Sequence, residues 1–391
     1  MRIGLVLPAV PGYSETFFVN KIKGLQSHGH EVVLFVNGAN TQKTFENATV
    51  IAASQLSGNP MLLLQIGYSF LRLLLFHFKT VLTFYRLERK DQSSVFSILK
   101  RIVSNIHLLS ATLDWIHFGF GTMALEKENV AQAIGARMAV SFRGFDIAIY
   151  PLKNPNCYHK LWKKVDKVHV ISDDIAGLVY KNGLQNREKV FKICPAISTN
   201  YFSNVNQIHN NSVVQILTIA RLHWKKGLEY TLEALALLKQ KGIPFQYTIV
   251  GDGPEKERLQ FAAHQLGLTD DIIFTGKLSP DDVKIALERS DLYLQCSIQE
   301  GFCNAVLEAQ AMGKLCIVSD AEGLAENVVD GLTGFVVPKR NPVSLYEKIV
   351  EVVKLSDKEK DNTKAKAIAR INREFTLVKQ QKEFLAFYTI D

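Results

Sequence analysis

The feature that most constrains this sequence is a repeated alternation of short apolar runs with helical segments. An apolar run at 2–8 leads through a turn at 11–15 into a helical segment, and a second apolar run follows at 32–36. A strand, a helix and a further parallel strand form the unit from which doubly wound sheets are built. Later β-rich runs of the same kind lie at 114–118, 136–142 and 167–172. We therefore predict an α/β fold.

The same alternation starts again after a polar stretch rich in Asn and Ser. A chain of 391 residues also exceeds what one hydrophobic core usually serves, so two domains are expected. We predict two doubly wound, Rossmann-like domains that face a cleft. Their expected bounds are 1–195 for the first domain, 196–212 for a linker, 213–374 for the second domain and 375–391 for a C-terminal helix that packs back on the first.

Five cysteines occur without a CxxC pair, so neither a disulfide framework nor a zinc site is indicated. The first residues contain an apolar run that prolines interrupt, and no A-x-A cleavage site follows it. A cytoplasmic location is the expectation.

Basic residues are concentrated in the first half of the chain. Residues 1–200 hold 23 Lys and Arg against 13 Asp and Glu. Such a balance favours an anionic membrane surface or an anionic ligand as partner. Neither zinc-finger spacing nor an RNP-like aromatic motif occurs, so no nucleic-acid partner is expected.

Residues 61–85 are long and apolar enough to suggest a membrane span, but polar and charged residues interrupt them. We expect helices with one apolar face, seated on the inner face of the cytoplasmic membrane or covering a lipid-bearing substrate. An ordinary pair of core helices is an equally weighted alternative.

Two glutamates, Glu300 and Glu308, flank the start of a predicted helix near Asn304. Ligands of an open α/β sheet bind beyond the carboxyl ends of its strands, where loops lead into helices. The backbone N–H groups of Asn304, Ala305 and Val306 would face a phosphate there, and the carboxylates would accept bonds from sugar hydroxyls. The alternative is a first-turn helix charge and an exposed loop residue.

A basic turn follows the apolar run at 213–220. Arg221 stands at the end of this run, and Lys226 precedes Gly227 and the next helix. Two cations at such a junction suit a diphosphate whose charge grows as it leaves. A basic surface loop is the alternative.

Five segments together resemble the retaining glycosyltransferase family of the GT-B fold known as family 4. They occur in the family's order: RLHWKKG, IVGDGPEKERL, FTGKLS, EGFCNAVLEAQAMG and DGLTGFVVP. The glutamate pair is similar to the family's E-x7-E motif. PGYSETF, LQSHGHEV and SFRGFDI look like a branch that builds bacterial surface polysaccharides, including capsules and lipopolysaccharide.

The resemblance implies a role for each matching residue. Arg221 and Lys226 would bind the donor diphosphate, Glu300 the transferred sugar and Glu308 the ribose. Further implied contacts are the backbone around Gly276, Lys277 and Leu278 to the base, Gly12, Ser14 and Glu15 in the first turn of the N-terminal domain, and His117 near the donor sugar. A histidine satisfied at a strand end is the alternative for His117.

Departures from the family affect the sugar and the acceptor. Arg143 stands where the family commonly has His, which makes it an acceptor-side candidate, Gly119 replaces a second histidine, and Cys303 replaces a frequent Pro. The resemblance implies transfer with retention, no metal and no cofactor, from a nucleotide-sugar donor to a saccharide or lipid-linked acceptor.

Three other functions share parts of this pattern. A nucleotide-sugar epimerase or phosphorylase could have the same fold. An NAD-type oxidoreductase needs G-x-G-x-x-G, but VGDGPEK has Lys256 at the third glycine. A membrane-surface binding module with a vestigial site would bind vesicles without nucleotide affinity.

Overall fold

The computed structural model of the 391-residue chain describes residues 1–12, 15–37, 42–53, 60–203 and 213–389. It divides into two compact units, Met1–Ile193 with Gln381–Asp391, and Cys194–Gln380. The division after Ile193 lies two residues from the predicted boundary, and the return to the first unit comes at Gln381 instead of residue 375. Much of the predicted linker, 204–212, lies outside the described residues.

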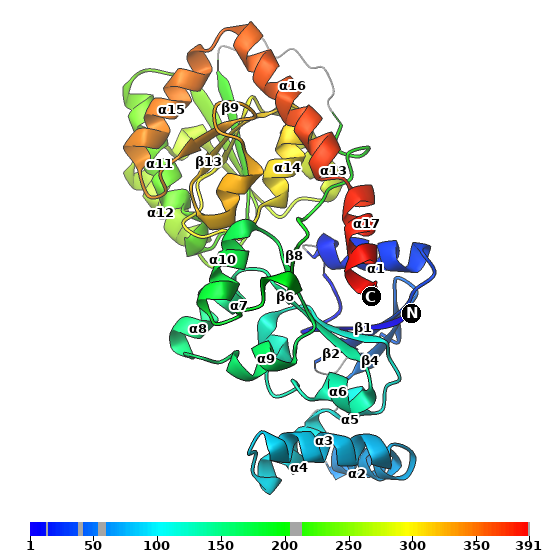
Figure 1. Cartoon of the computed structure of the whole chain (residues 1–391). Coiled ribbons are helices and arrows are strands. Elements are labelled where there is room, and N and C mark those ends of the chain that lie inside the picture. Colours follow the sequence, from blue (N-terminus) through cyan, green and yellow to red (C-terminus); the bar gives the residue numbers. More distant parts are fainter. Residues whose placement is uncertain (13–14, 38–41, 54–59, 204–212, 390–391) are drawn as a thin grey trace. The chain divides into compact units, whose positions relative to one another are not determined.

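The first unit is built on an eight-stranded sheet in the order β3-β4-β2-β1-β5-β6-β7-β8 (Figure 1). All neighbouring strands are parallel except β3 and β4. Chain order reverses between β1 and β5, so these strands flank the switch point at which ligands bind in such sheets. The strands are β1 (Arg2–Leu7), β2 (Glu31–Val36), β3 (Thr44–Phe45), β4 (Ala48–Ala52), β5 (Trp115–Phe118), β6 (Arg137–Phe142), β7 (Lys167–Val170) and β8 (Val190–Lys192).

Helices cover this sheet, and the last helix of the chain is one of them. Helix α17 (Leu377–Tyr388) contributes Phe384, Phe387 and Tyr388 to a core that also holds Trp115. These aromatic positions share one helical face, which explains why the segment packs on the sheet. The other helices here are α1 (Thr16–Ser27), α5 (Ile106–Leu109), α6 (Val130–Ile134), α7 (Phe145–Ala148), α8 (Tyr150–Lys153), α9 (His159–Lys164) and α10 (Asp173–Lys181).

The apolar stretch at 61–85 is helical, as predicted, and continues into a third helix. The helices are α2 (Pro60–Phe76), α3 (Phe78–Lys90) and α4 (Val95–Ser104), which Figure 1 shows side by side next to α5 and α6. The helix is interrupted between α2 and α3 at His77, whose backbone dihedral angles are not helical. Within the described part of the chain, no helix has the length and apolar character needed to cross a bilayer.

The second unit has a six-stranded, fully parallel sheet in the order β11-β10-β9-β12-β13-β14. Chain order reverses between β9 and β12, which places the switch point there. Its strands are β9 (Val214–Ile219), β10 (Phe245–Val250), β11 (Ile272–Gly276), β12 (Leu292–Gln295), β13 (Leu315–Ser319) and β14 (Phe335–Val337). Its helices are α11 (Leu228–Gln240), α12 (Lys256–Gln265), α13 (Pro280–Arg289), α14 (Asn304–Ala311), α15 (Pro342–Lys354) and α16 (Asp357–Glu374).

The prediction of two doubly wound α/β halves is therefore confirmed. Each half has its own buried core, dominated in the second unit by leucine, isoleucine and valine side chains of the strands and of α11 and α15. Parallel strands buried on both faces read as continuous apolar runs, which is the pattern that the sequence shows.

Candidate functional site

The turn after β9 carries both predicted cations and is folded tightly against the end of β12. Its short 3-10 helix spans Trp224–Lys226 and ends at Gly227, whose φ of +59° lies in the left-handed region. A Cβ at Gly227 would come within 2.4 Å of the Cys296 carbonyl oxygen. Glycine is therefore required where the turn approaches the neighbouring strand, and it brings the loops after β9 and β12 together.

The GDG segment after β10 supports the same turn. A Cβ at Gly251 would lie 1.9 Å from the Ala220 carbonyl oxygen, and one at Gly253 would lie 2.3 Å from that of Leu222. The Leu222 N–H donates to the Asp252 carbonyl oxygen at 3.0 Å. These two glycines thus let the backbone pack against the residues on either side of Arg221, a role that does not need a dinucleotide.

Lys226 and Glu300, predicted to contact different parts of one ligand, form an ion pair with each other. Backbone bonds fix both loops, because the Ile298 N–H donates to the Lys225 carbonyl oxygen at 2.7 Å. Burial opposes the charge of Lys226, but the Glu300 carboxylate outweighs it, so the net pKa of Lys226 is raised. Lys226 is therefore kept in its charged form at the carboxyl edge of the sheet.

Glu322 is a member of this cluster that sequence reasoning missed. Its carboxylate accepts the Glu300 backbone N–H at 2.9 Å and lies 3.3 Å from Lys339 Nζ. The residue follows β13, the next strand along the sheet, and has a φ of +39°. The rule that ligand groups gather after parallel strands could have found it.

Helix α14 begins at Asn304, as predicted, and presents backbone N–H groups at the switch point. Its N-cap residue Cys303 makes no regular side-chain capping bond, but its thiol, a weak acceptor, lies next to the Val306 N–H, so the N–H groups of Asn304 and Ala305 are the ones without a capping side chain. Asn327 holds the start of the helix in place by accepting the Cys303 N–H at 3.1 Å and donating to the Cys303 carbonyl at 2.9 Å.

Glu308 lies one turn into α14 and is partly buried. Burial raises the pKa of its carboxyl to about 7. Among the described residues, no hydrogen bond or ion pair to its side chain is formed. A carboxyl that is withdrawn from water without a partner costs free energy, which is the expected state of a group that waits for ligand hydroxyls.

Arg221 differs from Lys226 in having no acidic partner. Its guanidinium is exposed and makes neither a hydrogen bond nor an ion pair within the described parts of the chain. Burial first, and then the charge of Arg221, lowers the pKa of Lys225, and Arg221 also opposes the charge of Lys226. Two adjacent cations, only one of them paired, leave a net positive charge that an anion can neutralise.

The segment predicted to meet a base begins at Gly276, the last residue of β11, which is separated from β9 by β10 in the sheet. Gly276 has a φ of +72°, and its carbonyl accepts the Gly251 N–H at 2.8 Å. Lys277 is exposed, and Leu278 packs partly against the core cluster that includes Val306. The segment thus lies at the same carboxyl edge of the sheet as the cation turn.

His117 lies in the core of the first unit, where both ring nitrogens are engaged. Its Nδ1 is 3.0 Å from Lys21 Nζ and 2.5 Å from the Tyr388 hydroxyl, and its Nε2 is 2.7 Å from Ser141 Oγ. Burial, followed by the charge of Lys21, holds the pKa of His117 well below its usual range. This arrangement corresponds to the alternative weighed for this residue, a satisfied histidine at a strand end.

The Ile193 carbonyl decides which nitrogen of His169 and of His117 carries a proton. His169 Nε2 lies 2.9 Å from the Ile193 carbonyl, which can only accept, so His169 donates there and its Nδ1 accepts from Ser141 at 2.8 Å. Ser141 Oγ then accepts from His117 Nε2, and His117 Nδ1 accepts in turn. Both ring nitrogens of each histidine are therefore engaged, and Nδ1 of His117, with its single lone pair, accepts from Tyr388 or from Lys21.

The predicted first turn of this unit is held by its own glutamate. The Gly12 N–H donates to Glu15 Oε2 at 3.0 Å, and the Glu15 N–H returns to the Gly12 carbonyl at 3.0 Å. Ser14 lies outside the described residues. Glu15 is therefore bonded to Gly12 beyond the end of β1, one of the two strands that flank the switch point of the first sheet.

Arg143 follows β6 and stacks on aromatic rings. Its guanidinium carbon is 4.0 Å from the centroid of Phe17 and 4.8 Å from that of Phe18. Burial lowers the pKa of Arg143 to about 10, while Asp146 acts in the opposite direction.

At Gly119, where a second histidine was noted as missing, a Cβ would lie 2.4 Å from Leu7 Cδ2. The side chains around Gly119 therefore leave no room for a larger residue at this position.

All five cysteines are free. In the residues that the structure describes, no group of three or more His, Cys, Asp or Glu side chains is placed to hold a metal ion.

Comparison with known proteins relates most of the second unit to a glycosyltransferase family. Residues 203–370 match the family described as Glycosyl transferases group 1. WcaL of Escherichia coli (strain K12), named a colanic acid biosynthesis glycosyltransferase, is 28% identical over 96% of this chain and 96% of its own length. AmsK of Erwinia amylovora, named an amylovoran biosynthesis glycosyltransferase, is 25% identical over 65% of this chain and 64% of its own.

Solved structures show the same fold over nearly the whole chain. A glycosyltransferase from Rickettsia africae ESF-5 matches with a TM-score of 0.73 and 21% identity, covering 99% of this chain and 97% of its own. HepE of Anabaena, solved with UDP and glucose, matches with a TM-score of 0.72 and 16% identity over 99% and 98%. At these identities the likeness concerns the fold.

Proposed function

We propose that this chain, a glycosyltransferase whose residues 203–370 form a group 1 domain, moves a sugar from a nucleoside diphosphate sugar to a hydroxyl of a saccharide or lipid-linked saccharide. The relatives WcaL and AmsK are named for colanic acid and amylovoran biosynthesis. The product would accordingly belong to a bacterial surface polysaccharide. The reaction would take place in the cytoplasm, with peripheral contact to an anionic membrane.

One observation carries this proposal: the unsatisfied groups of the second unit gather at the switch point of its sheet. Arg221 and the N-terminus of α14 offer positive charge and N–H donors, and Glu308 offers a carboxyl without a partner. A phosphate suits the first two and a sugar diol suits the third. A nucleoside diphosphate has both chemical groups.

The proposed step is a displacement on one face of the sugar, with retention. The bond from the anomeric carbon to the β-phosphate oxygen breaks as the acceptor oxygen bonds to the same carbon from the same side. The acceptor proton passes to a phosphate oxygen. Arg221 and Lys226 would stabilise the charge on the leaving diphosphate, so positioning and electrostatics supply the catalysis without a metal or cofactor.

The ion pair between Lys226 and Glu300 gives both residues a defined state before the donor arrives. The diphosphate would share the lysine, and the sugar hydroxyls would take the place of the lysine at the Glu300 carboxylate. Exchanging one charged partner for another avoids a desolvated, unpaired charge at either stage. Glu322 would position Glu300 through its backbone N–H.

The proposal also includes residues of the first unit. Gly12 and Glu15 are bonded to each other after β1, which flanks the switch point, and Arg143 is the acceptor-side candidate. His117 receives no donor contact here, because its ring nitrogens are already bonded.

Sugar transfer from UDP-, GDP-, ADP- and dTDP-sugars to a lipid-linked acceptor tests the proposal. Glu300→Gln and Lys226→Ala should each lower the rate at least a hundredfold, because each removes a charge from the reacting centre. Lys348→Ala and Glu351→Gln provide matched controls, since these residues form a separate ion pair on α15. Full transfer by the first two variants would contradict the assignment.

The form of the product separates the alternatives. Retention of the anomeric configuration in the product, and undiminished activity with a chelator present, are expected. Conversion of the donor without any acceptor would indicate an epimerase or phosphorylase instead.

A further inference from the structure

Helix α2 exposes an apolar stripe on the side that faces away from the core. Leu64, Tyr68, Leu71 and Leu75 follow at steps of four, three and four residues, and each is between 55% and 76% exposed. At about 100° per residue these positions fall within roughly 60° of one another on the helix. On the opposite side Ile66 is buried in the unit, and Leu73 is buried with it. A helix that is apolar all round is normally covered on every side.

The neighbouring helices continue this exposed surface. Phe76 and Phe78 stand exposed at the break between α2 and α3, and Val95, Phe96 and Leu99 do so on α4, where Phe96 is 80% exposed. Ile98 and Ile102 of α4 point inward and are buried. Single exposed apolar residues are common, but nine of them on three helices that pack in sequence indicate an interaction surface.

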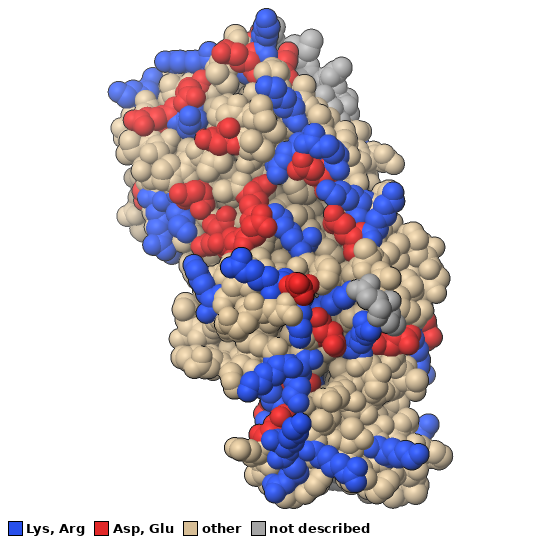
Figure 2. Space-filling view, viewed as in Figure 1, with Lys and Arg blue, Asp and Glu red and all other residues tan. Residues whose placement is uncertain are grey.

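Charges on the same helices are sorted by sign. Residues 60–104 contain seven Lys and Arg but only two acids, Glu88 and Asp91. Glu88 is fully buried, and Asp91 is bound by Lys160 at 3.1 Å. Figure 2 shows mostly blue and tan side chains over this end of the first unit, with a small red group among the blue. The exposed basic residues are Arg72, Lys79, Arg86, Arg89, Lys90 and Lys100.

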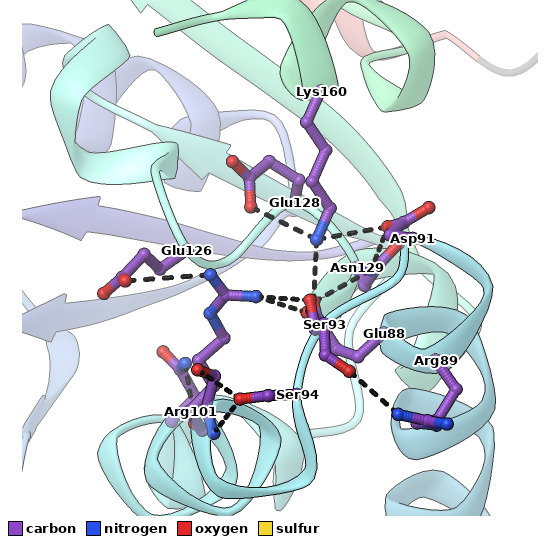
Figure 3. Close-up of polar contacts among 12 residues, drawn as sticks. Glu88, Arg89, Asp91, Ser93, Ser94, Arg101, Glu126, Glu128, Asn129 and Lys160 are labelled. Carbon is purple, nitrogen blue, oxygen red and sulfur yellow. Dashed lines mark hydrogen bonds and ion pairs between the residues drawn. The ribbon is translucent and has the colours of Figure 1, made fainter. Parts of the chain in front are cut away.

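Glu88 connects α3 and α4 to other parts of the first unit, as Figure 3 shows. Glu88 of α3 accepts from Arg101 of α4 at 2.5 Å, from Lys160 of α9 at 2.9 Å and from Asn129 at 2.9 Å. Although burial acts in the opposite direction, the bonds from Lys160 and Asn129 lower the pKa of Glu88 overall. This cluster therefore ties α3 and α4 to α9 and to Asn129 at the start of α6, while the bases Lys79, Arg86 and Lys100 of α3 and α4 stay exposed.

We propose that α2, α3 and α4 form a docking surface for an anionic lipid bilayer. The apolar side chains would enter the boundary between headgroups and acyl chains, and the basic residues would contact acidic headgroups. Charge complementarity favours this occupant, because the exposed charged residues of α2, α3 and α4 themselves are all basic. Docking is peripheral, in keeping with the absence of a spanning helix in the described residues. It rests on the geometry of the first unit and specifies the membrane contact of the proposed function.

Vesicle flotation of the full-length chain tests this surface. Wild type should bind vesicles that contain phosphatidylglycerol and bind pure phosphatidylcholine vesicles at least tenfold more weakly. Leu71→Asp with Leu75→Asp should lower binding to the anionic vesicles at least tenfold. The matched control is Phe261→Asp with Val343→Asp, two exposed apolar positions of the second unit, with 61% exposure at Phe261. This control should bind as wild type does.

A charge variant and a mass measurement complete the design. Arg72→Gln, Lys79→Gln and Arg86→Gln together should also weaken anionic binding tenfold, with an unchanged melting temperature. If wild type instead forms a dimer that Leu71→Asp with Leu75→Asp dissociates, and binds no vesicle, a second copy is the occupant and the proposal is overturned. Sugar transfer to a water-soluble acceptor should survive in both variants, so failure of docking is distinguishable from failure of the proposed function.

Discussion

The two units contain polar clusters of opposite character. In the first unit His117, Ser141 and His169 form a chain of hydrogen bonds in which every group has a partner. In the second unit Arg221 and Glu308 have no acidic or hydrogen-bonding partner among the described residues. Residue type does not separate the two clusters, because both contain groups that catalysis commonly uses. What separates them is satisfaction, since a completed network stabilises a fold and an incomplete one is available to a ligand.

Topology alone would not have given this contrast. Both sheets reverse chain order at one point, between β1 and β5 in the first unit and between β9 and β12 in the second. His117 lies inside strand β5, paired in register with Leu5 and Ala139. Lys226 and Glu300, by contrast, lie beyond the strand ends, Lys226 in the 3-10 turn after β9 and Glu300 in the loop after β12. A ligand reaches the second kind of position more readily than the first.

The largest expected effect concerns a second polar cluster of the first unit in which every charge is paired, the one around Glu88. Glu88→Ala should lower the free energy of unfolding by about 3 kcal/mol, because it leaves Arg101 and Lys160 without their buried partner. Urea unfolding measures this loss. A loss below about 0.5 kcal/mol would show that the cluster does not hold the helices.

Acid provides a second view of the same carboxylate. The folded pKa of Glu88 lies below its ordinary value, so its stabilisation is complete above that value and is lost as the pH falls through the lowered pKa. Glu88→Gln, which cannot titrate, should therefore show a weaker loss of stability below pH 4.5 than wild type.

The next prediction concerns His117 itself. His117→Ala should cost about 2 kcal/mol of unfolding free energy, since Lys21 and Ser141 lose a buried partner. Tyr388→Phe, which removes a contact to the same ring nitrogen, should act in the same direction. Nucleotide affinity and turnover of the folded fraction should stay within twofold of wild type. An unchanged melting temperature with a large fall in turnover would return His117 to the active site.

A proline tests the open cluster without changing a charge. Asn304 is the first residue of α14, where proline is well tolerated, and the preceding Cys303 is extended, as a residue before proline should be. Asn304→Pro removes one N–H from the helix start and should weaken nucleotide binding about tenfold. Asp357→Pro at the start of α16 is the matched control. Equal affinity in both variants would remove the helix terminus from the site.

The smallest expected effect is the pH response of Glu308. A carboxyl whose folded pKa is raised to about 7 stabilises the fold fully below its ordinary pKa and loses this contribution as the pH rises through 7. Glu308→Gln should therefore gain melting temperature over wild type at pH 8 but not at pH 5.

Donor binding should respond to the same proton. Ionised Glu308 accepts from a diol, so wild-type affinity for a nucleoside diphosphate sugar should rise roughly fivefold from pH 6 to pH 8. The diester phosphates of such a donor do not titrate in this range. Equal pH responses in wild type and Glu308→Gln would exclude the contact.

Much of this architecture could be predicted from the sequence, because apolar periodicity and turn chemistry are local. The start of α14 at Asn304 and the helices across 61–85 followed from such patterns. The environment of His117 could not be predicted in the same way. Its partner Tyr388 comes from a helix 271 residues further along the chain, and a motif at a strand end does not specify which buried groups meet it.

The open site was partly predictable for the same reason. Strand order decides that the loops after β9 and β12 are neighbours, so residues that lay 74 positions apart, Lys226 and Glu300, could be assigned to one ligand. That they bind each other, and that Glu322 supports Glu300, depends on side-chain reach, which sequence spacing does not carry.

Calorimetric titration with UDP, GDP, ADP and dTDP tests the central claim most directly, namely that the open cluster of the second unit holds a nucleoside diphosphate. Wild type should bind one of these nucleotides, and Arg221→Ala with Lys226→Ala should bind it at least a hundredfold more weakly, while Lys348→Ala binds it as wild type does. Equal affinity in wild type and the double variant would contradict the account.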